Sequence, residues 1–258
     1  MRLSDYKLCQ IIGKGGQGIV YNAQRKSDEV EVVIKKVKRK NNFFPTEIKL
    51  LQKVQDIEGI IKMIDFIDEK DYYYIVMEKI NKCEDLFQFL NNSDPLTEKF
   101  IRKMFYNIVK TVIKCRERGV FHRDLKDENI LVDLDTFEIK LIDFGVGCEY
   151  DYKEPEKMIK EYRATPEICP PEWILEKEYK LEKLTVWNLG TLLFTMLCGD
   201  IPFTTEDEIC SGKLIYTKTL SNELQDLIEQ CLKIKQEDRI SLDNILSHVW
   251  FKIDEKKS

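Results

Sequence analysis

The strongest constraint in this sequence is a run of eight residues, 122–129, that reads His-Arg-Asp-Leu-Lys-Asp-Glu-Asn, followed by Asp-Phe-Gly at 143–145. Between them, short apolar runs at 130–132 and 138–142 predict a β-hairpin with its turn at 133–136. Such a hairpin would hold Asn129 and Asp143 at the rim of one site. Because Mg²⁺ prefers carboxylate and amide oxygens, the segment predicts a magnesium site.

The same segment carries groups suited to phosphoryl transfer, which asks a protein mainly to position groups and neutralise charge. Asp124 is placed to orient an attacking hydroxyl and take its proton, and Lys126 to offset charge on the migrating phosphoryl group. An acidic surface run followed by a strand is the alternative interpretation. It does not explain why the eight-residue run and the Asp-Phe-Gly triplet at 143–145 occur together.

These residues resemble the H-R-D-L-x-x-x-N and D-F-G signatures of the eukaryotic protein kinases. Four further segments are similar to the Pim group of serine/threonine kinases, namely 85–87, 126–129, 170–173 and 198–203. The resemblance runs nearly end to end. It implies ATP and Mg²⁺ as cofactors, Asn129 and Asp143 as metal ligands, and Asp124, Lys126 and Thr165 as catalytic residues, with Thr165 bridging Asp124 and Lys126.

The resemblance also implies a bilobal α+β fold in one kinase domain over 1–258. We expect a small lobe at about 1–79 with a five-stranded sheet and one helix (helix C), a hinge at 80–85, a larger, mainly helical lobe at 86–251 and a tail at 252–258. Residue patterns predict strands at 6–12, 18–25, 30–38, 60–67 and 72–78. They predict helices starting near 45 and spanning 96–118, 186–197 and 242–251.

A glycine-rich segment, 13–20, matches G-x-G-x-x-G-x-V and lies between two predicted strands. Glycine lets backbone approach phosphate oxygens closely, whereas a Rossmann fingerprint would need a helix next. The resemblance therefore implies a nucleotide site. Its expected residues are Ile12, Gly13, Lys14, Gly15, Gly16, Gln17, Gly18, Val20, Val33, Lys35, Glu47, Met77, Glu78 and Ile80.

Several of these positions depart from the family pattern. Gln17 replaces an aromatic residue or Ser at the loop tip and should cover the phosphates less firmly, and Val33 replaces Ala and should narrow the adenine pocket. Met77 is the expected gatekeeper. Where Pim kinases have a hinge proline, Ile80 keeps its N–H, so adenine should bond to the Glu78 carbonyl and the Ile80 N–H.

Two ion pairs are expected from the resemblance. Lys35 should pair with Glu47, only twelve positions away, although Glu47 as an ordinary first-turn glutamate is the alternative. Glu172 and Arg239 should form a buried structural pair, which is costly to break from one side.

Arg123 is expected to need an anion from the activation segment, which in many kinases is a phosphate. No Ser or Thr lies between Gly145 and Thr165. We therefore expect Glu161 to supply the charge and the enzyme to be constitutively active, with phosphorylation of Tyr162 as the alternative.

The loop containing Lys126 and the later Thr165-Pro166-Glu167 follow the serine/threonine pattern. Four acids lie where family members hold arginines upstream of the target residue, which predicts basic protein substrates; they are Asp85, Asp127, Glu128 and Glu167. Because 34% of the chain is charged, surface acids without a function are the alternative.

The bulk properties fit this interpretation. The net charge of −5 gives no support for nucleic-acid binding. Eight cysteines, never closer than twelve residues apart, favour reduced intracellular thiols over a zinc site. The longest apolar run, around 189–198, is too short to span a bilayer. We expect a monomer in the cytoplasm or nucleus, without membrane or nucleic-acid partners.

Two other functions stay open. A pseudokinase that acts as a binding module is favoured by Gln17, Val33, Thr185 and the shortened region before helix C, although every residue with a chemical role is present. A small-molecule phosphotransferase is disfavoured by Thr165, Glu172 and Arg239, which in the family build a peptide-binding segment.

Overall fold

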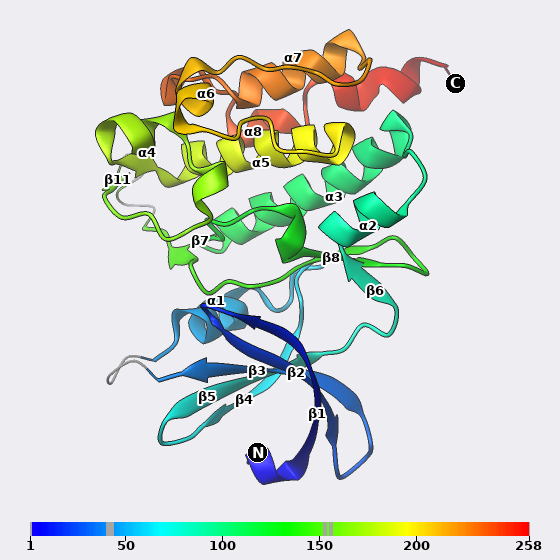
Figure 1. The fold of residues 1–258 in the computed structure, drawn as a ribbon, viewed down its shortest axis with the longest axis vertical. Helices are drawn as coiled ribbons and strands as arrows, with labels where there is room; N and C mark the ends of the chain where they lie inside the picture. The colour runs from blue at the N-terminus through cyan, green and yellow to red at the C-terminus, as the bar shows by residue number, and fades with distance from the viewer. Residues whose placement is uncertain (1, 40–43, 152–153, 155–156, 258) are drawn as a thin grey trace.

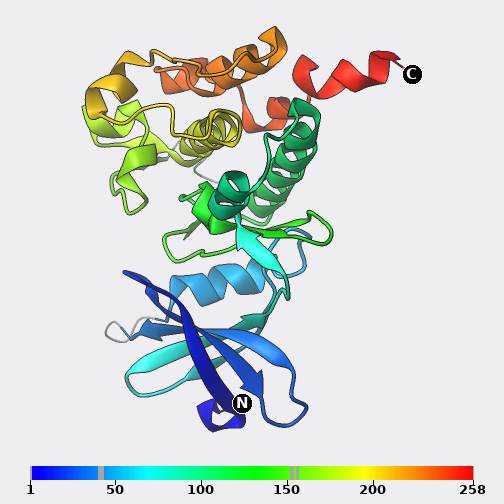
Figure 2. The same cartoon turned by 45° about the vertical axis from the view of Figure 1, so that its right-hand side comes forward.

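The structure, a computed structural model, describes residues 2–39, 44–151, 154 and 157–257, with the side chains of 254–257 left out. The chain forms a smaller lobe built on a β-sheet and a larger, mainly helical lobe (Figure 1). Turning the molecule by 45° shows the two lobes as distinct layers joined beside one edge (Figure 2). This is the predicted α+β architecture.

The smaller lobe is an antiparallel sheet with the strand order β1-β2-β3-β5-β4. Its strands are β1 Tyr6–Gly15, β2 Gly18–Arg25, β3 Glu31–Lys38, β4 Met63–Asp68 and β5 Tyr72–Glu78. The sheet confirms five strands, with β1 longer than expected because Gly13 and Gly15 stay paired with Val20 and Gly18. The predicted start of the fourth strand at 60 is wrong: Ile60 forms an isolated bridge with Leu141 in the other lobe.

One helix, α1 (Thr46–Val54), packs against β4 and against the larger lobe. Pro45 occupies its N-cap position, so the predicted helix start is confirmed. The helix buries one apolar face, which includes Ile48, Leu50 and Leu51, and it buries Glu47 in its first turn. A single apolar core continues from this face into the larger lobe.

The larger lobe is organised around two long helices. Its helices are α2 Leu86–Asn92, α3 Glu98–Glu117, α4 Pro171–Glu176, α5 Leu181–Cys198, α6 Glu206–Ser211, α7 Asn222–Cys231 and α8 Leu242–Ile245. Thr97 caps α3 by accepting from the Phe100 N–H, so this helix begins two residues later than expected. The α5 helix begins at Leu181, five residues before the predicted start at 186; it is buried over most of its length, and Gly199 ends it in the left-handed conformation.

The predicted helix over 242–251 is wrong. The α8 helix ends at Ile245, because the N–H groups of Ser247 and His248 bond to carbonyls three residues back. The chain then continues as a 3₁₀ helix, η5 (Val249–Lys257), whose Trp250 side chain is fully buried. The tail expected at 252–258 begins within η5, and residues 254–258 lie outside those whose side chains are described.

Short strands and 3₁₀ turns form much of the chain between the longer elements. They are β6 Cys83–Asp85, β7 Val120–Phe121, η2 Asp127–Asn129, β8 Ile130–Asp133, β9 Ile139–Leu141, β10 Cys148–Glu149, β11 Met158–Ile159, η3 Pro166–Ile168 and β12 Tyr179–Lys180. The β8–β9 pairing confirms the predicted hairpin, and β6 adds a third strand to it. Pairing of β7 with β10, and of β11 with β12, ties the activation segment to the larger lobe.

Among the described residues, no helix is long enough and apolar enough to cross a membrane.

Candidate active site

The carboxylate of Asp124 is oriented through both of its oxygens. Oδ1 accepts a hydrogen bond from the Thr165 backbone N–H at 3.0 Å, and Oδ2 accepts one from Nδ2 of Asn129 at 2.9 Å. Nδ2 of Asn129 also donates to the Asp124 carbonyl at 2.8 Å. These donors fix the position of a carboxylate that is only 6% exposed. The predicted Thr165 bridge is present at its Asp124 end, through the Thr165 backbone N–H, whereas no hydrogen bond among the described residues joins Thr165 to Lys126, which pairs with Glu128.

The hairpin brings the two predicted metal ligands to one place. The Ile142 N–H donates to the Asn129 carbonyl at 3.0 Å, so Asp143 directly follows the residue paired with Asn129. Asp143 has a φ of +62°, an uncommon conformation for a residue with a side chain, and its Oδ1 accepts from the Gly145 N–H at 3.1 Å. Strain of this kind often accompanies functional sites.

Lys35 of β3 joins the two lobes. Its Nζ lies 2.8 Å from Oε1 of Glu47 and 2.9 Å from Oδ1 of Asp143. Burial opposes the charged form of Lys35, but the two carboxylates outweigh that effect and raise its pKa. Lys35 therefore stays protonated. The ion pair with Glu47 rules out the alternative in which Glu47 is only a first-turn residue.

His122 holds the catalytic loop against the hairpin. Nε2 lies 2.8 Å from the Ile142 carbonyl, which can only accept, and Nδ1 accepts from the Asp124 N–H at 3.3 Å. Burial lowers the pKa of His122 and keeps the ring neutral, as these two bonds require. The sequence motif included His122 but did not indicate that it positions the backbone on both sides of the site.

The tip of the glycine-rich turn reaches across to the Asp-Phe-Gly segment. A Cβ atom added at Gly145 would lie 1.6 Å from Oε1 of Gln17 and 3.0 Å from Oδ1 of Asp143. Oε1 of Gln17 is buried and has no hydrogen-bond partner among the described residues. An orphaned amide oxygen beside a carboxylate fits a hard cation with its waters. The residues present are therefore compatible with Mg²⁺.

The part of the chain that the structure describes contains no cluster of three His, Cys, Asp or Glu residues able to hold a metal. Asn129 and Asp143 offer two oxygen donors. Because Mg²⁺ favours six, phosphate oxygens and water would have to supply the others, as is usual for Mg²⁺ bound with a nucleotide.

The hinge leaves one donor for an adenine ring. Met77, buried at 8% exposure, pairs with Val33 on the neighbouring strand. The Glu78 carboxylate turns away and accepts from the Lys62 N–H at 2.9 Å. The Ile80 N–H has no hydrogen-bond partner among the described residues, which is compatible with the bond expected from it.

The guanidinium of Arg123 is anchored to the activation segment. Nη2 donates to the Tyr179 hydroxyl at 2.7 Å and to the Glu161 carbonyl at 2.9 Å, and Nη1 lies 3.6 Å from Oε1 of Glu161. The predicted contact with Glu161 is present. Tyr179 is a partner that the sequence did not reveal, since it lies 56 residues away and within no motif.

Tyr162 packs into the larger lobe in this conformation. Its hydroxyl donates to the Thr165 carbonyl at 3.0 Å, and its ring stacks on Trp173 with centroids 5.6 Å apart. Burial raises the pKa of Tyr162. A phosphate on this hydroxyl would require the ring to leave its packed position.

The predicted buried pair of Glu172 and Arg239 is present. Nη1 and Nη2 of Arg239 contact Oε1 and Oε2 of Glu172 at 2.8 and 2.6 Å, and the side chains are 0% and 4% exposed. Arg239 also donates to the Lys183 and Lys233 carbonyls, so every nitrogen of its guanidinium group has a hydrogen-bond partner.

The four acids predicted to bind substrate differ in their surroundings. Asp85 caps α2 by accepting from the Gln88 N–H at 2.7 Å, and burial raises the pKa of Asp127. Glu128 pairs with Lys126, and Glu167 is exposed. Packing of β6 and α2 against η2 brings three of the acids to one surface, whereas Glu167 lies on the separate turn η3.

Comparison with known proteins agrees with this geometry. Residues 6–251 match the family described as the protein kinase domain. The chain is 39% identical over 265 residues to serine/threonine-protein kinase pim-2 of Danio rerio, which covers 95% of this chain and 84% of that protein. It is 37% identical over 261 residues to serine/threonine-protein kinase prk-2 of Caenorhabditis elegans, covering 96% and 58%. It is 30% identical over 265 residues to serine/threonine-protein kinase SIK1 of Rattus norvegicus, covering 98% and 34%.

Proposed function

The chain belongs to the protein kinase family, and from that premise we propose that it transfers the γ-phosphate of Mg-ATP to Ser and Thr hydroxyls of basic proteins. We propose further that it does so without prior phosphorylation of its activation segment. The observation that carries the proposal is the Asp124 carboxylate, held by Thr165 and Asn129 beside the Lys35–Glu47–Asp143 cluster.

The proposed mechanism assigns one task to each group. Mg²⁺, when bound with ATP, would neutralise phosphate charge, with Asn129 and Asp143 as its ligands. Lys35, kept protonated by its two carboxylate neighbours, would bind the α- and β-phosphates. Asp124 would orient the substrate hydroxyl and accept its proton. Lys126, now paired with Glu128, would exchange that partner for the transferring phosphoryl group.

Two features support Ser and Thr as the acceptors. The fish and nematode relatives are named serine/threonine-protein kinases. The chain also has Lys126 in the catalytic loop and the later Thr165-Pro166-Glu167, which follow the serine/threonine pattern. A basic substrate is supported by the carboxylates of Asp85, Asp127 and Glu128 on one surface.

A double variant, Asp85→Asn with Asp127→Asn, is expected to raise KM for an arginine-rich Ser peptide about tenfold and to leave kcat unchanged, because each lost charge pair contributes up to about 1 kcal/mol. Asn keeps the capping acceptor at position 85 and the turn acceptor at 127. The measurement is transfer of radiolabelled γ-phosphate to the peptide and to a version with Ala in place of Arg.

The matched control is Asp71→Asn with Asp94→Asn, which removes two exposed acids that lie outside β6, α2 and η2, the elements that bring the three acids together. Equal KM values for the two double variants would disprove the basic-substrate proposal. If the wild type binds Mg-ATP yet transfers nothing to this peptide or to a diverse peptide library, the protein is a pseudokinase that acts as a binding module.

Constitutive activity is supported by the contacts of Arg123. Its guanidinium, 5% exposed on its side chain, is satisfied by Tyr179 and Glu161 without a phosphate. The Glu161 carbonyl accepts from both Arg123 and Tyr179, which fixes the backbone of the segment as well as its charge.

Phosphatase treatment is therefore expected to leave kcat/KM unchanged, and Tyr162→Phe to retain activity. Glu161→Ala should lower kcat/KM only about threefold, since its carboxylate is half exposed and the backbone contact remains. Peptide phosphorylation by treated and untreated protein measures this. Loss of activity on phosphatase treatment, together with an inactive Tyr162→Phe protein, would instead identify Tyr162 as an activating phosphorylation site.

We also propose that the protein acts as a monomer in the cytoplasm or nucleus. Its eight cysteines are free, and Cys115, Cys169 and Cys231 are buried, as expected of a protein in a reducing compartment.

A further inference from the structure

The outward face of α3 carries lysine side chains from its first turn to its last. Four lysines lie at spacings of four, seven and four residues, and the acids of the helix are confined to its two ends; the lysines are Lys99, Lys103, Lys110 and Lys114. Like charges four residues apart destabilise a helix, and solvated helix faces normally interleave the two signs. This arrangement therefore has a cost that folding alone does not explain.

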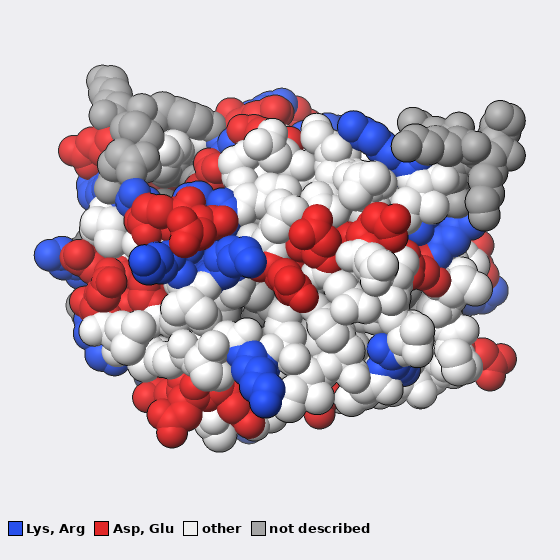
Figure 3. Space-filling model, turned by 90° about the horizontal axis from the view of Figure 1, so that it is seen from above, with Lys and Arg blue, Asp and Glu red and all other residues white. Residues whose placement is uncertain are grey.

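Three of the lysines form no ion pair with any described residue. Among the residues that the structure describes, no ion pair or hydrogen bond involves the Nζ atoms of Lys103, Lys110 or Lys114. The end of the larger lobe farthest from the sheet differs, since acidic and basic groups lie next to one another there (Figure 3). The α3 face is thus unusual for this chain, whose net charge is −5.

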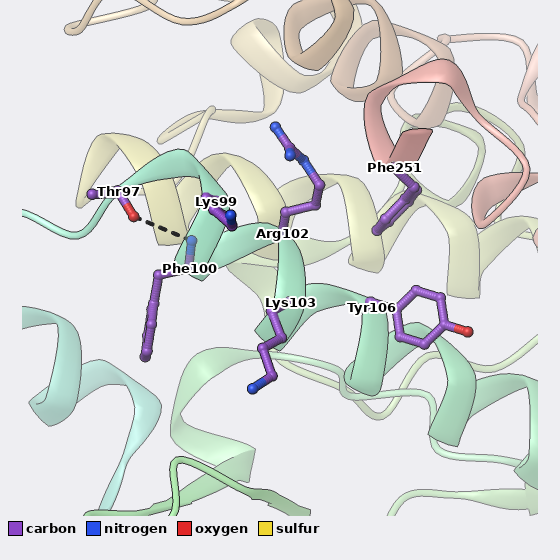
Figure 4. A pocket seen from close by; sticks show the side chains of 7 residues that line it. All are labelled: Thr97, Lys99, Phe100, Arg102, Lys103, Tyr106 and Phe251. Atoms are coloured by element: carbon purple, nitrogen blue, oxygen red, sulfur yellow. Dashed lines mark hydrogen bonds between the residues drawn. The ribbon is translucent and has the colours of Figure 1, made fainter. Parts of the chain in front are cut away.

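A cavity of about 450 Å³ opens beside Lys103, at the first half of α3. Its lining contains three cationic and three aromatic side chains and no carboxylate. Lys103 extends between Phe100 on one side and Tyr106 on the other (Figure 4). A second hollow of about 130 Å³ follows at Lys110 and Lys114.

The aromatic walls of the larger cavity are held in place before anything binds. Phe251 packs on Trp250 with ring centroids 4.9 Å apart and meets Tyr106 edge to face at 6.0 Å. On the other side, Phe100 meets Phe137 edge to face at 5.3 Å. Tyr106 and Phe137 are nonetheless 42% and 46% exposed. Preformed apolar walls lower the entropic cost of binding.

This surface lies away from the proposed catalytic groups. The first half of α3 is next to α2 and the C-terminal segment, whereas the activation segment and α4 lie at the opposite side of the larger lobe in both views (Figure 1, Figure 2). A partner held there would not cover Asp124 or Lys35.

We propose that the α3 face and the cavity beside Lys103 form a docking site for an acidic peptide segment with an aromatic or large aliphatic anchor. The anchor fills the cavity between Phe100, Tyr106 and Phe251, and the carboxylates lie along Lys103 and Lys110. A nucleic acid that followed the whole α3 face fits less well, because it would pass Glu58 and Glu138, which border the second hollow and repel a continuous polyanion, whereas a short peptide ends before them. The site is independent of the phosphoryl-transfer activity.

A fluorescein-labelled peptide with one Trp flanked by Asp and Glu tests the site directly by fluorescence anisotropy. The wild type should bind it, with an affinity that falls as salt rises. Lys103→Glu with Lys110→Glu should weaken binding at least about tenfold, since two attractive charges become repulsive. A peptide with Ala in place of Trp should bind more weakly to the wild type than the Trp peptide does.

The charge-matched control is Lys7→Glu with Lys213→Glu, two exposed lysines elsewhere, and thermal unfolding establishes that both double variants are folded. Activity toward a short basic peptide should be equal in all three proteins. Equal affinity of the two double variants for the Trp peptide overturns the proposal, as does loss of binding in the control. Tighter binding of a single-stranded oligonucleotide than of the peptide would assign the face to nucleic acid instead.

Discussion

Asp124→Asn is expected to lower kcat for peptide phosphorylation by about 10²–10⁴-fold, the range that general-base groups contribute. Asn cannot accept the hydroxyl proton, and one end of its amide would place a donor against Nδ2 of Asn129 or the N–H of Thr165, both of which donate to Asp124. Affinity for Mg-ATP should change little, because Lys35 and Asp143 are untouched. Transfer of labelled phosphate and binding of a fluorescent nucleotide measure the two effects.

Asp133→Asn is the matched control for this variant. Asp133 lies in the same hairpin, but its Oδ1 accepts from the turn N–H groups of Asp135 and Thr136, which an Asn side chain can also do. It should keep its wild-type rate. An Asp124→Asn protein as fast as this control would show that another group activates the hydroxyl.

Removing one partner of the Glu172–Arg239 pair should produce the largest loss of stability. Glu172→Ala leaves a guanidinium that is 0% exposed without its counter-charge, and Arg239→Ala leaves a buried carboxylate alone. We expect each variant to lose about 3–5 kcal/mol of unfolding free energy, as one-sided breaks of buried pairs do. The midpoint of urea unfolding measures the loss.

Two further variants distinguish the net contribution of this pair to the unfolding free energy from the cost of leaving one buried charge unpaired. Asp243→Ala breaks the partly exposed pair with Arg116 and should cost about 0–1 kcal/mol. The apolar double variant Glu172→Met with Arg239→Met should be far more stable than either single variant, since no buried charge remains. If Glu172→Ala costs no more than Asp243→Ala, the pair is not a structural anchor.

The sequence predicted most of the parts whose position follows from local pattern. The hairpin between Asn129 and Asp143 has strand periodicity on both sides of a turn, so its pairing, and with it the approach of these two residues, could be predicted. The Lys35–Glu47 pair was expected from the family resemblance, and the structure contains it.

Contacts between distant segments could not be predicted in this way. Tyr179, which accepts from Arg123, lies in β12, which pairs with β11, and neither strand is longer than two residues, so no periodicity marks it. The last helix was predicted too long because its apolar spacing continues past Ile245, whereas Trp250 is buried from a tighter 3₁₀ turn. Thr165 was expected to bridge Asp124 and Lys126, but a residue type indicates nothing about its backbone N–H, which makes the contact with Asp124.

The contact between Gln17 and Gly145 has a consequence for kinetics. Because Oε1 of Gln17 lies against Gly145 and close to Asp143, we expect a triphosphate that approaches Asp143 to displace the loop tip from this position. Association then includes a unimolecular opening step, and its observed rate should level off as nucleotide concentration rises. Adenosine, which lacks the phosphates that need this space, should associate without that plateau.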